Sequence, residues 1–216
     1  MAAKKKAKGK KPAKKSPAKA KASASRKAAP AKKVPAKKAP AKKAAGVVAK
    51  AAPAHNPWHS YADQLAQEMR TTLKVMRAFP ADQAGFQPHP RSGSAMQLFH
   101  TFGVEQNAAL MAVNGNLDLA KAFSMTVPAT LADAIDSFER AATSVVTAAR
   151  SAGPDAWHRP QPFFTGPQQM GQVPAGAIAS MMLADQIHHR GQLSVYLRMA
   201  GGKVPSIYGP SADEPW

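Results

Sequence analysis

The 216-residue sequence contains no cysteine, and this absence removes several kinds of chemistry. The chain forms no disulfide, carries no thiolate nucleophile and offers no sulfur ligand of the cysteine type to zinc. Any thiol that takes part in a reaction must therefore arrive with a second substrate. The absence does not decide between an oxidising and a reducing compartment.

Acidic residues are also scarce, and residues 1–54 contain none. That segment holds eighteen lysines and one arginine, so its formal charge is +19, while residues 55–216 carry −1. The net charge of +18 and the pI near 10.4 therefore describe the N-terminal segment alone. We expect two parts: a basic tail at 1–54, and a nearly neutral domain at 55–216 that is long enough for a single core.

The tail has few bulky apolar side chains and repeats short units of proline, alanine and lysine, such as PAKK at 30–33 and 35–38. Proline interrupts helices and like charges repel, so this composition predicts a disordered segment. It resembles the tails of linker histones and of some bacterial nucleoid-associated proteins. Lysines that neutralise phosphates release counterions, which predicts sequence-independent, salt-sensitive binding of nucleic acid. A solubilising leader, or a contact with anionic lipid, is the alternative.

Long apolar runs are missing as well. No run approaches the ~18 residues of a membrane span, and no apolar stretch of the signal-peptide type follows the first lysines. We expect a cytoplasmic protein, associated with the nucleoid if the tail binds DNA.

Four segments of residues 55–216 carry apolar side chains at intervals of three and four, the spacing of an amphipathic helix. Asn56 followed by Pro57 is typical of a helix start, and Ser94 with Gln97 has the spacing of a capping box. The predicted helices lie at about 57–79, 94–114, 130–153 and 174–201. Residues 154–173 are predicted to be a polar, proline-rich loop, and no segment alternates like a strand. The pattern predicts an all-α four-helix bundle.

Asp185 and His189 lie one turn apart in the last predicted helix, on the face that carries Ile178 and Met181. This face should point into the bundle, where an unpaired carboxylate is costly. A divalent cation would solve the problem, because side chains at i and i+4 can share one ion. His100, within the apolar stripe of the second predicted helix, is the natural third ligand. Two histidines and one carboxylate would leave a coordination position open.

The same residues also have a structural interpretation. A buried histidine is usually a satisfied core residue, and Asp185 could accept hydrogen bonds from Arg190 or from a loop backbone. The spacing of the residues does not decide between the two interpretations. Gln192 and Tyr196 share the face of His189 and are candidates for orienting a substrate, while the catalytic residue itself is unknown.

Several motifs resemble the DinB family, the damage-inducible, YfiT-like metalloproteins. They are HHRGQL at 188–193, YLR at 196–198 and VPSIYGPSADE at 204–214. His100 followed by Glu105, and PHPRS at 88–92, fit the same family. The resemblance covers about residues 58–214 and none of the tail.

This resemblance implies a four-helix bundle with a long crossover connection, often dimeric, that holds a divalent metal such as zinc, nickel, iron or manganese. Transferred by position, the ligands are His100, Asp185 and His189. Many members have histidine where Asp185 stands. The presence of aspartate in place of histidine at position 185 leaves two alternatives. Asp185 is a carboxylate ligand that prefers a harder metal, or the site is weaker and its third ligand is water.

Two functional hypotheses follow. The first is a metal-dependent enzyme of the DinB type, hydrolase-like or a transferase that uses a small-molecule thiol, with a tail that binds nucleic acid non-specifically. The second is a non-catalytic, stress-related nucleoid protein whose bundle oligomerises, for example as a homodimer, or binds a partner. The resemblance does not name a substrate.

Overall fold

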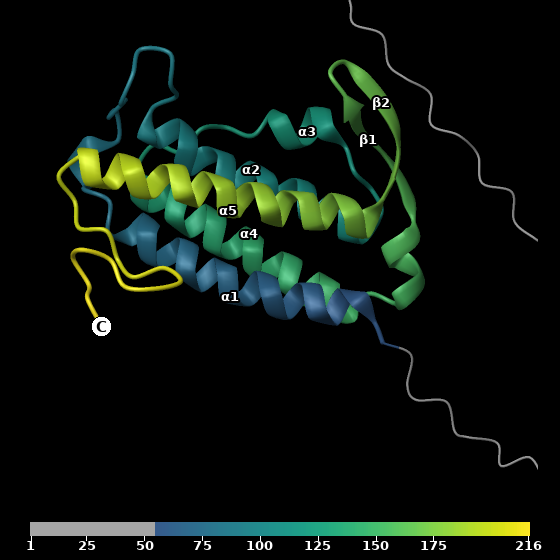
Figure 1. Cartoon of the computed structure of the whole chain (residues 1–216). Coiled ribbons are helices and arrows are strands. Elements are labelled where there is room, and N and C mark those ends of the chain that lie inside the picture. The colour runs from purple at the N-terminus through teal and green to yellow at the C-terminus, as the bar shows by residue number, and fades with distance from the viewer. Residues whose placement is uncertain (1–54) are drawn as a thin grey trace, which may run out of the picture. The chain divides into compact units, whose positions relative to one another are not determined.

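The computed structural model describes residues 55–216, so the expectations about the tail lie outside the described residues. Four long helices dominate the fold (Figure 1): α1 (Pro57–Arg77), α2 (Ala95–Asn114), α4 (Leu131–Ser151) and α5 (Ala175–Met199). A short helix α3 (Leu119–Phe123) lies between α2 and α4. Single 3₁₀ turns occupy Ala81–Gln83 and Pro154–His158. The fold confirms the predicted all-α bundle.

The helix starts are those that the sequence predicts. The Asn56 side chain accepts a hydrogen bond from the Trp58 amide at 3.1 Å, with Pro57 in the first turn of α1. Ser94 forms a complete capping box with Gln97 at the start of α2. At the other end of α2, Gly115 adopts a left-handed conformation with φ of 78°, which ends the helix.

The core shows the direction of each helix. One buried cluster joins the ends of α1 and α5 to the starts of α2 and α4, and includes Phe79, Leu197, Phe99 and Phe138. A second cluster joins the starts of α1 and α5 to the ends of α2 and α4, and includes Trp58, Ala179, Val113 and Ala149. Thus α1 and α5 run in one direction and α2 and α4 in the other. The connection between α2 and α4 is therefore a long crossover from one end of the bundle to the other, as the resemblance implied (Figure 1).

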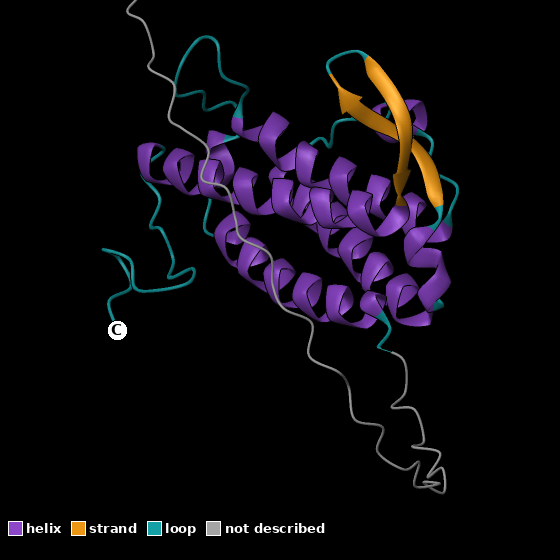
Figure 2. Ribbon diagram, turned by 45° about the vertical axis from the view of Figure 1, so that its right-hand side comes forward, coloured by secondary structure: helices purple, strands orange, loops and turns teal. Residues whose placement is uncertain are grey.

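The prediction of an irregular loop at 154–173 is wrong. Within it, β1 (Pro160–Gly166) and β2 (Gln169–Pro174) form an antiparallel hairpin that rises above the helices (Figure 2). Three prolines and two glycines in these strands hide the alternation, but Gln161 and Phe163 are buried on one face while their neighbours are exposed. The buried Gln161 side chain donates to the Ala112 carbonyl at 2.6 Å and accepts from the Leu117 amide at 3.0 Å. These bonds fix the hairpin to the end of α2.

A buried ion pair connects α1 to α5. Arg190 is 1% exposed, and its Nη1 lies 2.6 Å from Oε2 of Glu68. The hydroxyl of Tyr208, in the segment after α5, donates to the same Glu68 oxygen at 2.8 Å and also bonds Arg190. This interhelical role explains why Arg190 is not available to Asp185.

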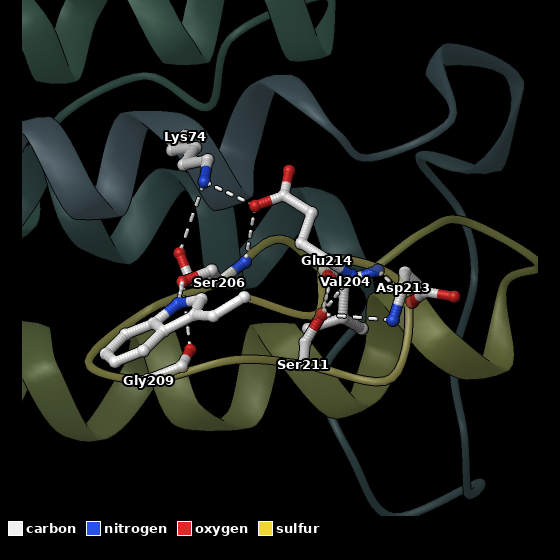
Figure 3. Close-up of polar contacts among 8 residues, drawn as sticks. Lys74, Val204, Ser206, Gly209, Ser211, Asp213 and Glu214 are labelled. Atoms are coloured by element: carbon white, nitrogen blue, oxygen red, sulfur yellow. Dashed lines mark hydrogen bonds and ion pairs between the residues drawn. The ribbon is translucent and has the colours of Figure 1, made fainter.

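Residues 203–216, the C-terminal segment, fold back along the bundle through polar contacts (Figure 3). The Glu214 carboxylate accepts from Lys74 of α1 at 2.6 Å and from the Ser206 amide at 2.8 Å. Asp213 accepts from the Val204 amide and pairs with Arg198 of α5 at 2.5 Å. The DinB-like motif at 204–214 thus has a structural role, since it ties the chain end to α1 and α5.

None of the helices formed by residues 55–216 has the length and apolar character needed to cross a membrane.

Candidate metal centre

Glu105 lies in the middle of α2 and is buried, with 4% of its surface exposed. Its Oε1 lies 2.6 Å from Nδ1 of His189 on α5. Its second oxygen, Oε2, is buried and has no hydrogen-bond partner among the described residues. A buried carboxylate oxygen without a partner is destabilising, so this atom calls for a ligand.

Asp185 lies one turn before His189 on α5, with its Oδ1 3.8 Å from Nδ1 of His189. Glu105, Asp185 and His189 each offer one ligand atom, and these atoms lie within 4.8 Å of one another. About 48% of the Asp185 side chain is exposed, against 5% for Glu105. The group is therefore closed on the Glu105 side and open to solvent on the Asp185 side.

The electrostatics of the group are those of a buried acid beside a base. Burial raises the pKa of Glu105 to about 7, although the hydrogen bond from His189 opposes this rise. The hydrogen bond to Glu105 in turn raises the pKa of His189. Near neutral pH the two side chains therefore compete for a proton, and a cation could replace it.

The structure brings together two of the three residues predicted as ligands, Asp185 and His189. It places Glu105 with them, whereas His100, half-buried more than one turn earlier on α2, is not a member of the group. Binding of a metal by His100, Asp185 and His189 stays a prediction. The geometry favours Glu105 as the α2 ligand.

The side chains predicted to orient a substrate have other partners. Gln192 is exposed and donates to Nε2 of His188 at 2.9 Å. The Tyr196 hydroxyl donates to the Gly93 carbonyl at 3.1 Å, and its ring packs edge-on against Phe86. Tyr196 thus holds the loop before α2.

The sequence does contain a signal for Glu105. Glu105 stands within a largely apolar helix, and no basic residue occurs three or four positions away, where Thr101, Phe102, Ala108 and Ala109 are found. An acidic side chain without a helical ion-pair partner, on a buried helix, must find its partner on another element.

The donor set fits a divalent cation. Two carboxylates and one imidazole supply oxygen and nitrogen ligands, which suit zinc, iron or manganese. The unpartnered Oε2 of Glu105 is the observation that favours a cation, because a bound cation would satisfy it.

The chain is similar to several known proteins over the described domain. It is 34% identical over 110 residues to uncharacterized protein YrdA of Bacillus subtilis (strain 168). That match covers 50% of this chain and 64%, just under two thirds, of the length of YrdA.

Two solved structures share the fold. A DinB-like protein from Bacillus cereus ATCC 10987 has a TM-score of 0.55 and 20% identity, covering 68% of this chain and 95% of its own. The DinB-like protein YjoA from Bacillus subtilis has a TM-score of 0.54 and 17% identity, covering 67% of this chain and 94% of its own. At these identities the likeness concerns the fold alone.

The model of the DinB family matches residues 54–215, which is nearly the whole domain and excludes almost all of the basic tail. The resemblance seen in the motifs is thereby confirmed: this chain belongs to the DinB family.

Proposed function

We propose that this protein binds one divalent cation through Glu105, Asp185 and His189 and uses it in metal-dependent chemistry of the hydrolase or thiol-transferase kind. The observation that carries the proposal is the buried, unpartnered Oε2 of Glu105 beside two further ligand atoms. Burial of a carboxylate is costly unless its charge is paired, and a bound cation would pair it.

Each of the three residues would have a distinct part. Glu105 is rigidly buried on α2 and would fix the position of the cation. The Nδ1 of His189 would exchange its hydrogen bond with Glu105 for the metal. Asp185, half-exposed on the open side, leaves space for a substrate to approach. A cation with open positions can lower the pKa of a water or a thiol and can polarise a carbonyl group.

The absence of cysteine bears on the transferase alternative, because any thiol would have to be a cosubstrate. A screen of metal-loaded protein with a low-molecular-weight thiol and an electrophile would test it. Product formation that requires both the thiol and the metal would support a transferase. Product formation from ester or amide substrates without a thiol would support a hydrolase.

The test of the metal proposal is Zn²⁺ affinity by equilibrium dialysis and elemental analysis, on the full chain. Glu105→Gln keeps the shape of the side chain but removes a charged ligand. It should weaken binding by more than the roughly 10- to 100-fold that loss of an outer-sphere partner costs. His100→Gln is the matched control on the same helix and should bind like the wild type. Strong loss in His100→Gln with normal binding by Glu105→Gln would refute the proposed ligand set.

The charge of residues 1–54 supports a second proposal, non-specific binding of nucleic acid. Eighteen lysines without a single acidic residue would release counterions from phosphates on binding. In gel-shift assays at low salt, deletion of residues 1–54 should abolish binding to duplex DNA. Binding that survives the deletion would refute the role of the tail.

A further inference from the structure

A cavity of about 310 Å³ opens beside the candidate metal centre. Its floor is formed by α2 and α5. The α2 residues share one face of the helix and are Thr101, Val104, Glu105 and Ala108. The α5 residues are Met181, Met182 and Asp185. Two of the three proposed metal ligands, Glu105 and Asp185, therefore line the cavity directly. Its volume lies at the lower end of the roughly 300–1,000 Å³ of ligand sites, which suits a small molecule.

The roof of the cavity comes from the two connections that lie between α2 and α4 and between α4 and α5. Leu119 and Phe123 project from α3, and the consecutive Phe163 and Phe164 project from β1. These elements lie over α2 and the first half of α5 (Figures 1 and 2). Phe163 is 5% exposed and packs edge-on against Phe164, with 5.7 Å between ring centroids. The crossover and the hairpin thus form an aromatic cover for the cavity.

The side chains that line the cavity are mostly apolar. Apart from the Thr101 hydroxyl, the only polar side chains among the lining residues are the two acids at the metal centre. No lysine, arginine, asparagine or glutamine lines the cavity. An anionic ligand would find no positively charged side chain there, and sugars or nucleotides would find few hydrogen-bond donors among the lining side chains.

We propose that this cavity binds the apolar, uncharged body of the substrate, an aromatic or short-chain group, with its reactive end directed at Glu105 and Asp185. This inference rests on the proposed metal function, because it assigns the reactive end to the same centre.

The mouth of the cavity supports this occupant. Phe123, Phe164 and Met181 are 61%, 46% and 42% exposed, an unusual exposure for large apolar side chains that stand together. A small apolar ligand would cover part of each. Burial of this surface would supply the affinity, and the two acids would supply the orientation.

The test uses N-phenyl-1-naphthylamine, a neutral fluorescent probe, with the full-length protein. We expect saturable binding of one probe per chain. Ala108→Phe, which places a ring in the floor, should abolish it. Neutral 1-naphthalenemethanol should displace the probe at concentrations about tenfold lower than anionic 1-naphthalenesulfonate. Both competitors are used in large molar excess over the protein, so that binding of the anion to the basic tail does not lower its free concentration appreciably.

A second pair of variants guards against misfolding of Ala108→Phe. Phe164→Ala removes an exposed ring from the mouth and should weaken probe binding roughly tenfold. Met170→Ala is the matched control, because Met170 faces Phe164 across the hairpin, is 54% exposed and does not line the cavity. Equal affinity of the two variants, or displacement by the anion as strong as by the alcohol, would overturn the proposal.

Metal content measured on the same samples separates the two proposals. Ala108→Phe that keeps its Zn²⁺ but loses the probe supports both. A wild type that binds the probe in this Ala108-dependent way yet binds no Zn²⁺ supports the apolar cavity and overturns the metal function. A wild type that binds Zn²⁺ but shows no saturable probe binding overturns the cavity assignment alone.

Discussion

Glu105 determines what the candidate site can do. Its carboxyl group is buried, shares one oxygen with His189 and leaves the other without a partner. Such a group is unfavourable when it is ionised and alone, which is why burial raises its pKa to about 7. A cation would reverse this effect by stabilising the ionised form. The residue that destabilises the metal-free domain is therefore the one that should bind metal most firmly.

The affinity for metal should depend on pH in a definite direction. Burial raises the pKa of Glu105 to about 7, and Glu105 raises the pKa of His189, so both side chains bind protons more readily than in water. Metal must displace these protons. Zn²⁺ affinity measured by competition with a chelating dye should therefore fall as pH drops below about 7, by about tenfold per unit for each proton released. An affinity that does not change between about pH 5.5 and about pH 7.5 would contradict the assignment of these ligands.

The predictability of the site differs from residue to residue. Asp185 and His189 follow from the sequence, because helical spacing places them together without any knowledge of the fold. For Glu105 the sequence indicates only that its partner lies on another element, because that partner is 84 positions away and α2 is buried on much of its surface. The stripe of apolar residues pointed to His100, which is not a member of the group that Glu105, Asp185 and His189 form.

At the scale of elements, two glycines of α5 have opposite roles. Gly191 is exposed, and a Cβ there would have no neighbour within 4 Å, so this glycine is not needed for close helix packing. A Cβ on buried Gly176 would lie 2.1 Å from the indole of Trp157. That indole packs edge-on against Trp58, with 4.8 Å between ring centroids. Gly176 therefore allows the close contact between α5 and the 3₁₀ turn at Pro154–His158.

Alanine substitutions should separate these roles. Gly191→Ala should stabilise the domain by roughly 0.5–1 kcal/mol, because alanine favours a helix interior over glycine. Gly176→Ala should destabilise it by roughly 1–3 kcal/mol, because the Trp157 ring must move. Urea unfolding of both variants beside the wild type provides the measurement. Stabilisation by Gly176→Ala would show that the packing of Trp157 is not tight.

The helices were predictable and the hairpin was not, for a physical reason. Caps such as Asn56 and Ser94 are local signals, and they locate helix starts to within a residue. The hairpin at Pro160–Pro174 has prolines and glycines in its strands, and it is held largely by Gln161, whose partners lie on the end of α2 and beyond it. Long-range hydrogen bonds of this kind leave no periodic trace in the sequence.

At the scale of the described domain, the buried Glu68–Arg190 pair holds α1 against the helix that carries Asp185 and His189. Glu68→Gln should destabilise the domain by about 3–5 kcal/mol, because it leaves a buried guanidinium without its charge partner. Asp63→Asn, which breaks the exposed pair of α1 with Arg150, is the matched control and should cost less than about 1 kcal/mol. Equal effects in thermal unfolding would show that the buried pair contributes no more than a surface contact.

The crossover connection between α2 and α4 helps to shape the candidate site. Because α2 and α4 run in parallel, the chain must return along the bundle between them, and α3 lies on that return path. Together with the hairpin it covers the cavity next to Glu105. The elements that depart from a plain four-helix bundle are thus the ones that shape the candidate site.

The most direct measurement is the position of the metal itself. A crystal soaked in Zn²⁺, with data collected at the zinc absorption edge, should give one strong anomalous peak in the domain. We predict that this peak lies in bonding contact with carboxylate oxygens of Glu105 and Asp185 and with Nδ1 of His189. A peak bound to His100 without Glu105, or no peak at this group, would contradict the account.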